Sequence, residues 1–552
     1  MDKQDIFERN LLALARFVPL CSKLSRAQTT LNRYKFLDSP SGELIPAWVD
    51  PSGSAHPLHS LVDPHREARR LIDTVNEGFI ILTGLGGGFY AEAALEKPGV
   101  SLVLVIDYDI NGIAELLCHR DYIKIFSDPR FHFLADPPEN AIEQYILNIY
   151  QPMLCGGIRT LPLRGRTSTD GRVFTNAAHA VETAIQKISA DYSVQAHFGT
   201  RWFSNIIRNI NKAGAHMNPL PPVKRTAVTA AGPSLFGQTA EIRRRRKEFF
   251  LIAADTSLPC LLSQDIRPDA VVSIDCQHIS YYHFMAGIPE ETMLFLDLAS
   301  PPLIASRKHA PVFFSGNHPL TGYICNAWRA FPEVDTSGGN VTYASVALAE
   351  KLGAETIELF GADFSYPLGL SYSRGTYIYP HFEIRQKRTA PLEGLHSSFL
   401  FRGPLEKINS GENWYYESPS LKFYREALEE KTKTMRSGLI PRQGMGAPVR
   451  IHPAVKTGKK TLSFFGCGIM KSSPSDFLSG YRDKIHSLKI PPENIAGFFD
   501  SLRGDEKQVF TTLLPAAAAL KRRDSGLNVS ELLEKTKSHC IDVIEKVLNT
   551  ET

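Results

Sequence analysis

Short apolar runs alternate with amphipathic segments along much of the chain. The runs at 78–83, 102–106, 249–254 and 355–360 are each followed directly by a glycine or an aspartate, and a similar run spans 225–229. Runs of this length are typical of strands buried on both faces, and the segments between them carry apolar residues at helical spacing. We therefore predict a multidomain α/β fold with two Rossmann-like parallel-sheet units and helical N-terminal, linker and C-terminal segments.

The length predicts several domains. At 552 residues the chain is too long for one core, because domains average roughly 100–200 residues. A proline-rich stretch at 217–223 cannot continue a helix, and the pattern becomes helical after 440. We expect an N-terminal helix and turn-rich segment at 1–57, an N-terminal Rossmann-like domain at 58–150, a helical linker region at 151–222, a central α/β domain at 223–440 and a C-terminal helical domain at 441–552.

Composition gives no sign of nucleic-acid binding, a membrane span or a metal site. The chain has 62 basic and 58 acidic residues, a balance too even to favour nucleic acid. No apolar run approaches the roughly 18–20 residues of a membrane span, so we expect no membrane span and a cytoplasmic location. The eight cysteines lack the spacing of a zinc site, and we predict no metal site.

The first α/β unit carries part of a nucleotide-binding pattern. A strand-like run leads into Gly84-Leu85-Gly86-Gly87-Gly88, a helix follows, and the next run ends at Asp107. Phe89 stands where close helix packing in the full fingerprint needs glycine or alanine. The pattern favours a structural domain over a cofactor site, with a methyltransferase as a remote alternative.

The second unit contains a tight turn, Gly232-Pro233-Ser234, between a strand and a helix. Backbone amides and the Ser234 hydroxyl at such a helix start can bind a phosphate. The same residues can also serve only as a turn and a helix cap, and the turn alone does not separate the two interpretations.

Aspartates end three predicted strands of this unit. Parallel strands bring their carboxyl ends to one edge of the sheet, so these aspartates should lie together in a ligand-binding crevice. Carboxylates there can accept hydrogen bonds from ribose hydroxyls or a base amino group. The candidate binding residues are Gly232, Pro233, Ser234, Asp255, Thr256, Asp275, Gly338, Gly339, Asn340, Gly361 and Asp363.

Two further features lie beside this crevice in the sequence. His381 and His396 follow the strand that ends at Asp363, where a loop can cover the site, and they are the candidate catalytic residues. The basic run 243–247 points around a helix, which favours a solvated helix end over an anion site.

The central region resembles the motility accessory factor (Maf) flagellin glycosyltransferases, whose central domain belongs to the MptE-like group. It is also similar to bacterial CMP-sialic-acid sialyltransferases, which share a Gly-Pro-Ser turn and a later Gly-x-Asp-Phe strand end. Ala231 stands where the sialyltransferases carry Asn, and Ser371 and Tyr372 replace a near histidine of Maf. The resemblance rests on Leu58-His59-Ser60, Asp63-Pro64, Glu67-Ala68, the Trp202 to Asn209 helix, the 231–235 turn, the segments 253–256 and 268–275, and 352–354 leading to 361–364.

The resemblance implies a catalytic domain at 223–440 that transfers a nonulosonic acid from a CMP donor to Ser or Thr of flagellin. Ser234 would then face the donor phosphate, the aspartates would hold the nucleoside, and His396 would act as the acid or base. No cofactor is expected beyond the CMP-sugar substrate. The expected partners are flagellin and the CMP-activated sugar.

Two other functions stay open. The MptE-like group includes pyrophosphokinases that transfer diphosphate from ATP to a hydroxymethylpterin, and these would use the aspartates to bind Mg²⁺. A non-catalytic chaperone that binds flagellin is the second alternative. The long N- and C-terminal regions favour the flagellar function.

Overall fold

The computed structural model divides the chain into two compact units, and its parallel sheets confirm the multidomain α/β fold. The smaller unit comprises 1–197, 489–507 and 517–535, and the larger comprises 198–488, 508–516 and 536–552. The structure describes residues 2–27, 32–75, 77–215, 219–308, 310–410, 413–455 and 465–550.

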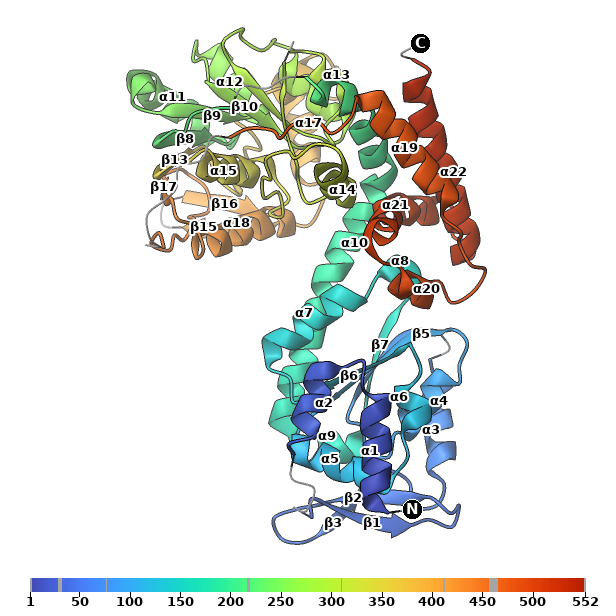
Figure 1. Ribbon diagram of the computed structural model, residues 1–552. Helices are drawn as coiled ribbons and strands as arrows, with labels where there is room; N and C mark the ends of the chain where they lie inside the picture. Colours follow the sequence, from blue (N-terminus) through green and yellow to red (C-terminus); the bar gives the residue numbers. More distant parts are fainter. Residues whose placement is uncertain are drawn as a thin grey trace. The chain divides into compact units, whose positions relative to one another are not determined.

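A parallel sheet with the order β6-β5-β4-β7 forms the core of the smaller unit (Figure 1). Every residue of β4 is buried, as expected for a strand covered on both faces. The strands are β4 (Gly78–Thr83), β5 (Val100–Asp107), β6 (Phe131–Ala135) and β7 (Ile158–Pro162). The helices that follow or precede them are α3 (Pro64–Ile72), α4 (Phe89–Leu95), α5 (Ile110–His119), α6 (Ile123–Phe126), α7 (Glu139–Ile149), α8 (Pro152–Cys155) and α9 (Arg164–Thr167).

The N-terminal segment contains more regular structure than the sequence indicated. Two helices, α1 (Lys3–Ala13) and α2 (Val18–Leu24), precede an antiparallel sheet in the turn-rich part. Gly42 and Gly53 adopt positive φ angles of 82° and 84° in the turns between its strands, a conformation that glycine adopts without strain. The strands are β1 (Tyr34–Asp38), β2 (Leu44–Val49) and β3 (Ala55–Pro57).

The described strands of the larger unit form a seven-stranded parallel sheet with the order β12-β11-β10-β9-β8-β13-β17. The strand order reverses between β8 and β13, and ligands in open α/β sheets bind at the carboxyl edge beside such a switch point. The strands are β8 (Arg225–Thr229), β9 (Phe250–Ala254), β10 (Ala270–Ser273), β11 (Met293–Asp297), β12 (Val312–Phe314), β13 (Thr356–Phe360) and β17 (Gly438–Pro441).

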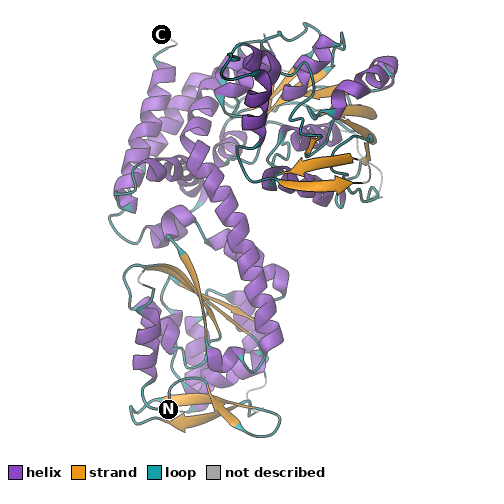
Figure 2. Cartoon of the chain, turned by 180° about the vertical axis from the view of Figure 1, so that it is seen from behind, coloured by secondary structure: helices purple, strands orange, loops and turns teal. Residues whose placement is uncertain are grey.

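Helices cover both faces of this sheet. In Figure 1, α11 and α12 lie on one side of β8 to β10 and α15 lies on the other, and Figure 2 shows the same arrangement from behind. A small antiparallel sheet of β14 (Tyr366–Pro367), β16 (Asn413–Glu417) and β15 (Glu406–Ser410) follows β13. The helical elements are α11 (Ser234–Arg244), η1 (Arg246–Glu248), η2 (Asp255–Ser257), α12 (Leu258–Ser263), η3 (His278–Phe284), α13 (Pro302–Ala305), α14 (Pro319–Ala327), α15 (Val341–Lys351), α16 (Ile378–Glu383), α17 (Leu392–Leu400) and α18 (Pro419–Thr432).

A long helix, α10 (Gly171–Ala213), supports the loops that follow two of these strands. Asn205 Nδ2 donates to the carbonyls of Cys276 and Ala299, and Asn209 Nδ2 donates to those of Leu298 and Ser300. Since residues four apart share one helix face, the Trp202 to Asn209 segment holds the carboxyl ends of β10 and β11 in place.

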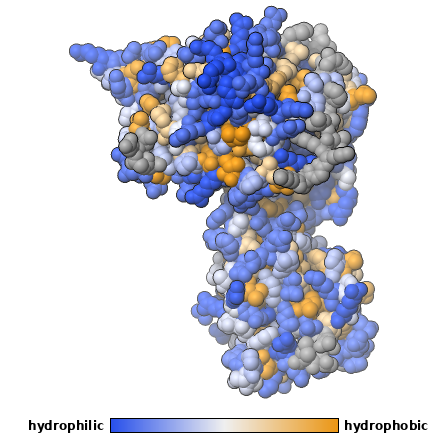
Figure 3. All heavy atoms as spheres, turned by 90° about the vertical axis from the view of Figure 1, so that its left-hand side faces the viewer, coloured by the Kyte–Doolittle hydropathy of each residue, from blue (hydrophilic) through white to orange (hydrophobic). Residues whose placement is uncertain are grey.

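The C-terminal region is helical, with α19 (Pro474–Ser487), α20 (Ile495–Ser501), α21 (Gly504–Arg523) and α22 (Val529–Leu548). Among the described residues, no helix combines the length and apolar character that crossing a membrane requires. Figure 3 shows a mostly hydrophilic face on which apolar side chains occur in small groups, as on ordinary folded domains.

Candidate functional site

The turn after β8 and the end of β13 form one hydrogen-bonded unit. Asp363 accepts from the Ser234 hydroxyl at 2.6 Å and from the Ser234 amide at 2.8 Å, and the Gly232 amide donates to the Gly361 carbonyl at 2.8 Å. A Cβ on Gly232 would lie 2.4 Å from Asp363 Oδ2, so only glycine permits this approach. Gly361, with a φ of 64°, likewise leaves no room for a Cβ against the Ala230 carbonyl.

In this structure, the Asp363 carboxylate accepts hydrogen bonds from the Ser234 amide and hydroxyl, the groups that were expected to bind a phosphate. Asp363 is 3% exposed and Ser234 is 7% exposed. Burial raises the pKa of Asp363, and the hydrogen bonds from Ser234 oppose that shift. The Asp363 carboxylate therefore caps the start of α11 by accepting from the Ser234 amide, and a role of Ser234 in donor binding stays a prediction.

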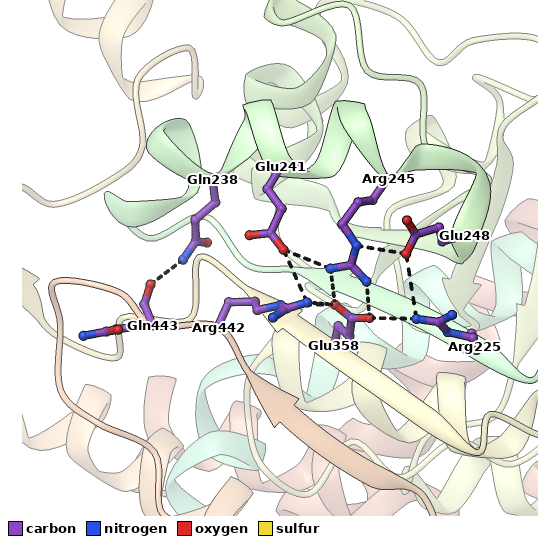
Figure 4. Close-up of polar contacts among 8 residues, drawn as sticks. All are labelled: Arg225, Gln238, Glu241, Arg245, Glu248, Glu358, Arg442 and Gln443. Carbon is purple, nitrogen blue, oxygen red and sulfur yellow. Dashed lines mark hydrogen bonds and ion pairs between the residues drawn. The ribbon is translucent and has the colours of Figure 1, made fainter.

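A backbone segment after β17 completes this unit. The Met445 amide donates to Ser234 Oγ at 2.8 Å, and the Gly446 amide donates to Asp363 Oδ1 at 3.1 Å. The segment is anchored just before these residues, since the Gln443 carbonyl accepts from Gln238 of α11 and Arg442 is paired with Glu358 of β13 (Figure 4).

The basic run 243–247 takes part in the same anchor and is not simply a solvated helix end. Arg245 binds Glu358 through both terminal nitrogens at 2.8 Å, and Arg225 lies 3.5 Å from Glu358 Oε1 (Figure 4). The Arg245 guanidinium is the main reason that the pKa of Glu358 falls to about 2. The sequence interpretation missed this because the partner carboxylate lies more than a hundred positions away.

The aspartates that end β9 and follow β10 lie close together. Asp255 Oδ2 accepts from Ser273 Oγ at 2.6 Å, and its Oδ1 accepts from the Thr256 amide at 2.6 Å and from the Thr256 hydroxyl at 3.0 Å. Burial raises the pKa of Asp275, and the negative charge of Asp255 raises it further. Among the described residues, Asp275 has hydrogen bonds to Gln277 alone, including one from its amide at 2.9 Å, which leaves part of the carboxylate available to a ligand.

Three tyrosines interact electrostatically with these two carboxylates. Burial raises the pKa values of Tyr372, Tyr377 and Tyr424, and the charge of Asp255 or Asp275 raises each of them further, which places the phenols near the carboxylates. Tyr372 and Tyr377 lie in the segment after β14, with ring centroids 6.2 Å apart, and Tyr424 lies on α18. We call Asp255, Asp275 and the three tyrosines the acid–tyrosine cluster.

The glycine-rich loop before α15 lies against the same cluster. A Cβ on Gly339 would lie 3.2 Å from a ring carbon of Tyr424, and one on Gly338 would overlap the ring of Tyr343. Asn340 caps α15 by accepting from the Tyr343 amide at 3.0 Å. The structure therefore brings Gly339 to the cluster, whereas Asn340 has a capping contact.

The two histidines chosen from the sequence lie at the periphery. His381 packs against the rings of Tyr282 and Tyr377, with centroids 5.8 and 6.5 Å away. His396 packs against Tyr379 and Phe382 instead. Burial lowers the pKa values of both imidazoles, and no described hydrogen bond joins either one to the cluster. Their catalytic roles stay predictions.

A fourth aspartate at a strand end was missed. Asp297 ends β11, is 6% exposed, and accepts from the Ala299 amide at 2.7 Å. Burial raises the pKa of this carboxyl to about 6. The apolar run Leu294-Phe295-Leu296 before it gives the same signal as the runs that were recognised.

The glycine-rich turn of the smaller unit is filled by protein side chains. Asp107 accepts from the Leu85 amide at 2.7 Å and from Arg166 Nε at 3.1 Å, while His59 accepts from the Gly87 amide at 2.9 Å. A Cβ on Gly86 would lie 2.5 Å from His59 Nε2. Protein side chains therefore pair with two amides of the turn and with the strand-end aspartate, which favours the structural interpretation of this unit.

The fold and the acid–tyrosine cluster define a multidomain α/β protein with a candidate ligand site at the carboxyl edge of a parallel sheet. A family model described as 6-hydroxymethylpterin diphosphokinase MptE-like matches residues 202–369, which include Ser234, Asp363 and the two aspartates of the cluster but none of its three tyrosines. Among the described residues, no group of three or more histidine, cysteine, aspartate or glutamate side chains is arranged to hold a metal ion.

The chain is also similar to individual proteins. An uncharacterised protein of Treponema pallidum (strain Nichols) is 30% identical over 172 residues, which are 31% of this chain and 82% of that protein. A second uncharacterised protein of T. pallidum is 29% identical over 158 residues, 28% of this chain and 56% of that protein. The solved structure of the Maf glycosyltransferase from Magnetospirillum magneticum AMB-1 matches with a TM-score of 0.59 and 12% identity, covering 99% of this chain and 95% of that one. The central region therefore matches an MptE-like family model, and the chain shares its fold with the Maf glycosyltransferase structure.

Proposed function

We propose that the protein is a glycosyltransferase that moves a nonulosonic acid from a CMP donor to Ser or Thr of flagellin. The observation that carries the proposal is the acid–tyrosine cluster at the carboxyl edge of the sheet, in a fold shared along 99% of the chain with a Maf glycosyltransferase. The similarity to that enzyme suggests glycosyl transfer, and the resemblance of the central domain to CMP-sugar enzymes suggests the donor.

The cluster offers groups suited to a nucleotide sugar. The Asp275 carboxylate can accept a further hydrogen bond from a ribose hydroxyl or from the cytosine amino group. The tyrosine rings offer flat apolar surfaces for a base or sugar, and their hydroxyl groups can donate to oxygen atoms of the ligand. Asp255 holds Ser273 and Thr256 and thereby fixes the end of β9 beside Asp275.

The transfer itself makes two demands on the site. The bond between the sugar and the phosphate breaks through an oxocarbenium-like state, so the departing CMP phosphate must be stabilised as negative charge develops on it. A base must also remove the proton of the acceptor hydroxyl. In this proposal CMP-sugar is a substrate, and the reaction requires no cofactor.

The matching family model favours a second candidate, an MptE-like 6-hydroxymethylpterin diphosphokinase. That activity would require ATP and Mg²⁺, with Asp255 and Asp275 as metal ligands. The model matches residues 202–369 alone, whereas the similarity to the Maf structure extends over both units. The flagellar proposal therefore accounts for more of the chain.

Calorimetry on the purified protein separates these functions. We expect CMP to bind without added metal and more tightly than ATP, and Asp275→Asn to weaken CMP binding by about 10-fold or more, since a hydrogen bond to a charged group contributes roughly 1.5–3 kcal/mol. Asp265→Asn, which changes an exposed aspartate of the same unit, serves as the control. Tighter binding of ATP that depends on Mg²⁺ would favour the diphosphokinase, and binding of neither nucleotide would favour the chaperone.

A further inference from the structure

A third histidine, His283, interacts electrostatically with Asp275. It is on η3, the 3-10 helix that comes after β10, and is 8% exposed. Its ring meets the ring of Tyr377 edge-on, with centroids 4.6 Å apart and an interplanar angle of 75°. His283 therefore contacts the acid–tyrosine cluster directly.

One polar atom of His283 is buried without a role in holding the fold. Its Nδ1 has no hydrogen-bond partner among the described residues. Buried polar atoms are nearly always paired in folded proteins, and an unpaired one at a ligand site is a common sign that the ligand supplies the partner.

Asp275 is the charged neighbour of His283. The imidazole is near enough for its charge to lower the pKa of the Asp275 carboxyl, against the larger effect of burial. An imidazole supported by a nearby carboxylate is a recurrent arrangement for accepting a proton from a hydroxyl.

We propose that His283 is the proton acceptor of this site, with Asp275 as the group that stabilises its protonated form. The proposal rests on the proposed glycosyl transfer. In the step, the acceptor oxygen forms a bond to the anomeric carbon, the bond between that carbon and the phosphate oxygen breaks, and the bonding electrons leave with CMP. The proton of the acceptor hydroxyl moves to His283, which later releases it to water.

The surroundings of His283 define the expected pH dependence. Its element packs against η2, α12 and α13, of which η2 contributes Asp255; Tyr377 faces the ring, and Arg307 lies over Tyr281 of η3. An imidazole must be unprotonated to accept a proton, so the rate should rise with pH on the acidic side of its pH profile. A variant without the imidazole should lose this rise in rate, the acidic limb of the pH profile.

The test measures release of CMP from a CMP-activated nonulosonic acid in the presence of flagellin, for wild type, His283→Gln and His278→Gln. His278 is exposed on the same short helix and serves as the matched control. We expect His283→Gln to lower kcat by about 100-fold or more with little change in KM, and to lose the acidic limb. His278→Gln should behave as wild type.

Each outcome bears on a different claim. An active wild type together with an active His283→Gln that keeps its pH profile would overturn the assignment of His283 and leave the proposed function standing. If His396→Gln loses activity while His283→Gln stays active, His396 and not His283 is the proton acceptor. A wild type that releases no CMP would contradict the proposed function, and the role of His283 with it.

Since His283→Gln could fail to fold, CMP binding and melting temperature are measured on the same samples. The result we predict is a variant that is folded and binds CMP but is inactive.

Discussion

At the scale of single residues, Ser234 shows how one motif allows two interpretations that the sequence alone does not separate. Its hydroxyl donates to Asp363 at 2.6 Å and accepts from the Met445 amide at 2.8 Å. The hydroxyl therefore connects three separate parts of the chain. The sequence showed the turn but could not show the second partner, because Met445 is more than two hundred residues away.

Ser234→Ala separates the structural role of the hydroxyl from a donor-binding role. The contacts in the structure predict a loss of about 1–3 kcal/mol in the free energy of unfolding, because the substitution removes a hydrogen bond to a buried carboxylate. A direct contact with the donor phosphate predicts an additional weakening of CMP binding by about 10- to 150-fold. Denaturation and calorimetry on one preparation measure both quantities.

Ser418→Ala provides the comparison for that experiment. Ser418 caps α18 by accepting from the Leu421 amide at 3.2 Å, and it has no part in the Ser234 turn. Its replacement should lower stability by about 1 kcal/mol and leave CMP affinity unchanged. If Ser234→Ala gives the same pattern, the phosphate site lies elsewhere in the crevice.

At the scale of secondary-structure elements, Glu358 joins α11 to two neighbouring strands of the sheet. Its carboxylate, 4% exposed on β13, is bound by Arg245 at the end of α11 and by Arg442 directly after β17. The contact fixes the segment that leads to Met445 and Gly446. The ion-pair network thus positions the backbone that closes the Ser234 turn.

This network predicts an acid-sensitive stability. The pKa of Glu358 falls from 4.5 to about 2, chiefly through Arg245, so its contribution to stability is present above the unfolded-state value and is lost as the pH falls through the folded-state value. Glu358→Gln should lower the free energy of unfolding at pH 7 by on the order of 2 kcal/mol and make it less dependent on pH between about 4.5 and 2.

The matched control is Glu426→Gln, which changes an exposed glutamate on α18. Chemical denaturation across this pH range measures both variants. A Glu358→Gln variant whose stability and acid limb match those of wild type would show that the network contributes nothing to folding.

At the scale of the whole molecule, the sequence predicted much of the architecture because parallel strands leave a strong local signal. The buried runs before Asp107, Asp255 and Gly361 became strands of the two parallel sheets. The antiparallel β1 to β3 sheet was missed, since its short strands lie among turn residues and lack a long apolar run.

The site was predictable only where its residues come directly after strands. Asp255 and Asp275 were found because the carboxyl edge of a parallel sheet gathers the first residues beyond each strand. Tyr372, Tyr424 and His283 come from loops and helices whose approach to that edge depends on tertiary packing, and nothing local in the sequence marks them. Distance along the chain after Gly-x-Asp-Phe suggested His396, but that spacing does not determine where a loop folds.

The most direct test of the central claim is the intact mass of flagellin after incubation with the purified protein and a CMP-activated nonulosonic acid. We predict that wild-type protein adds the mass of one sugar or of a whole number of sugars. Asp255→Asn should add little or none, since it disturbs the carboxylate that holds Ser273 and Thr256 beside Asp275, and Asp265→Asn should act as wild type. Flagellin of unchanged mass with folded wild-type protein, or full modification by Asp255→Asn, would contradict the account.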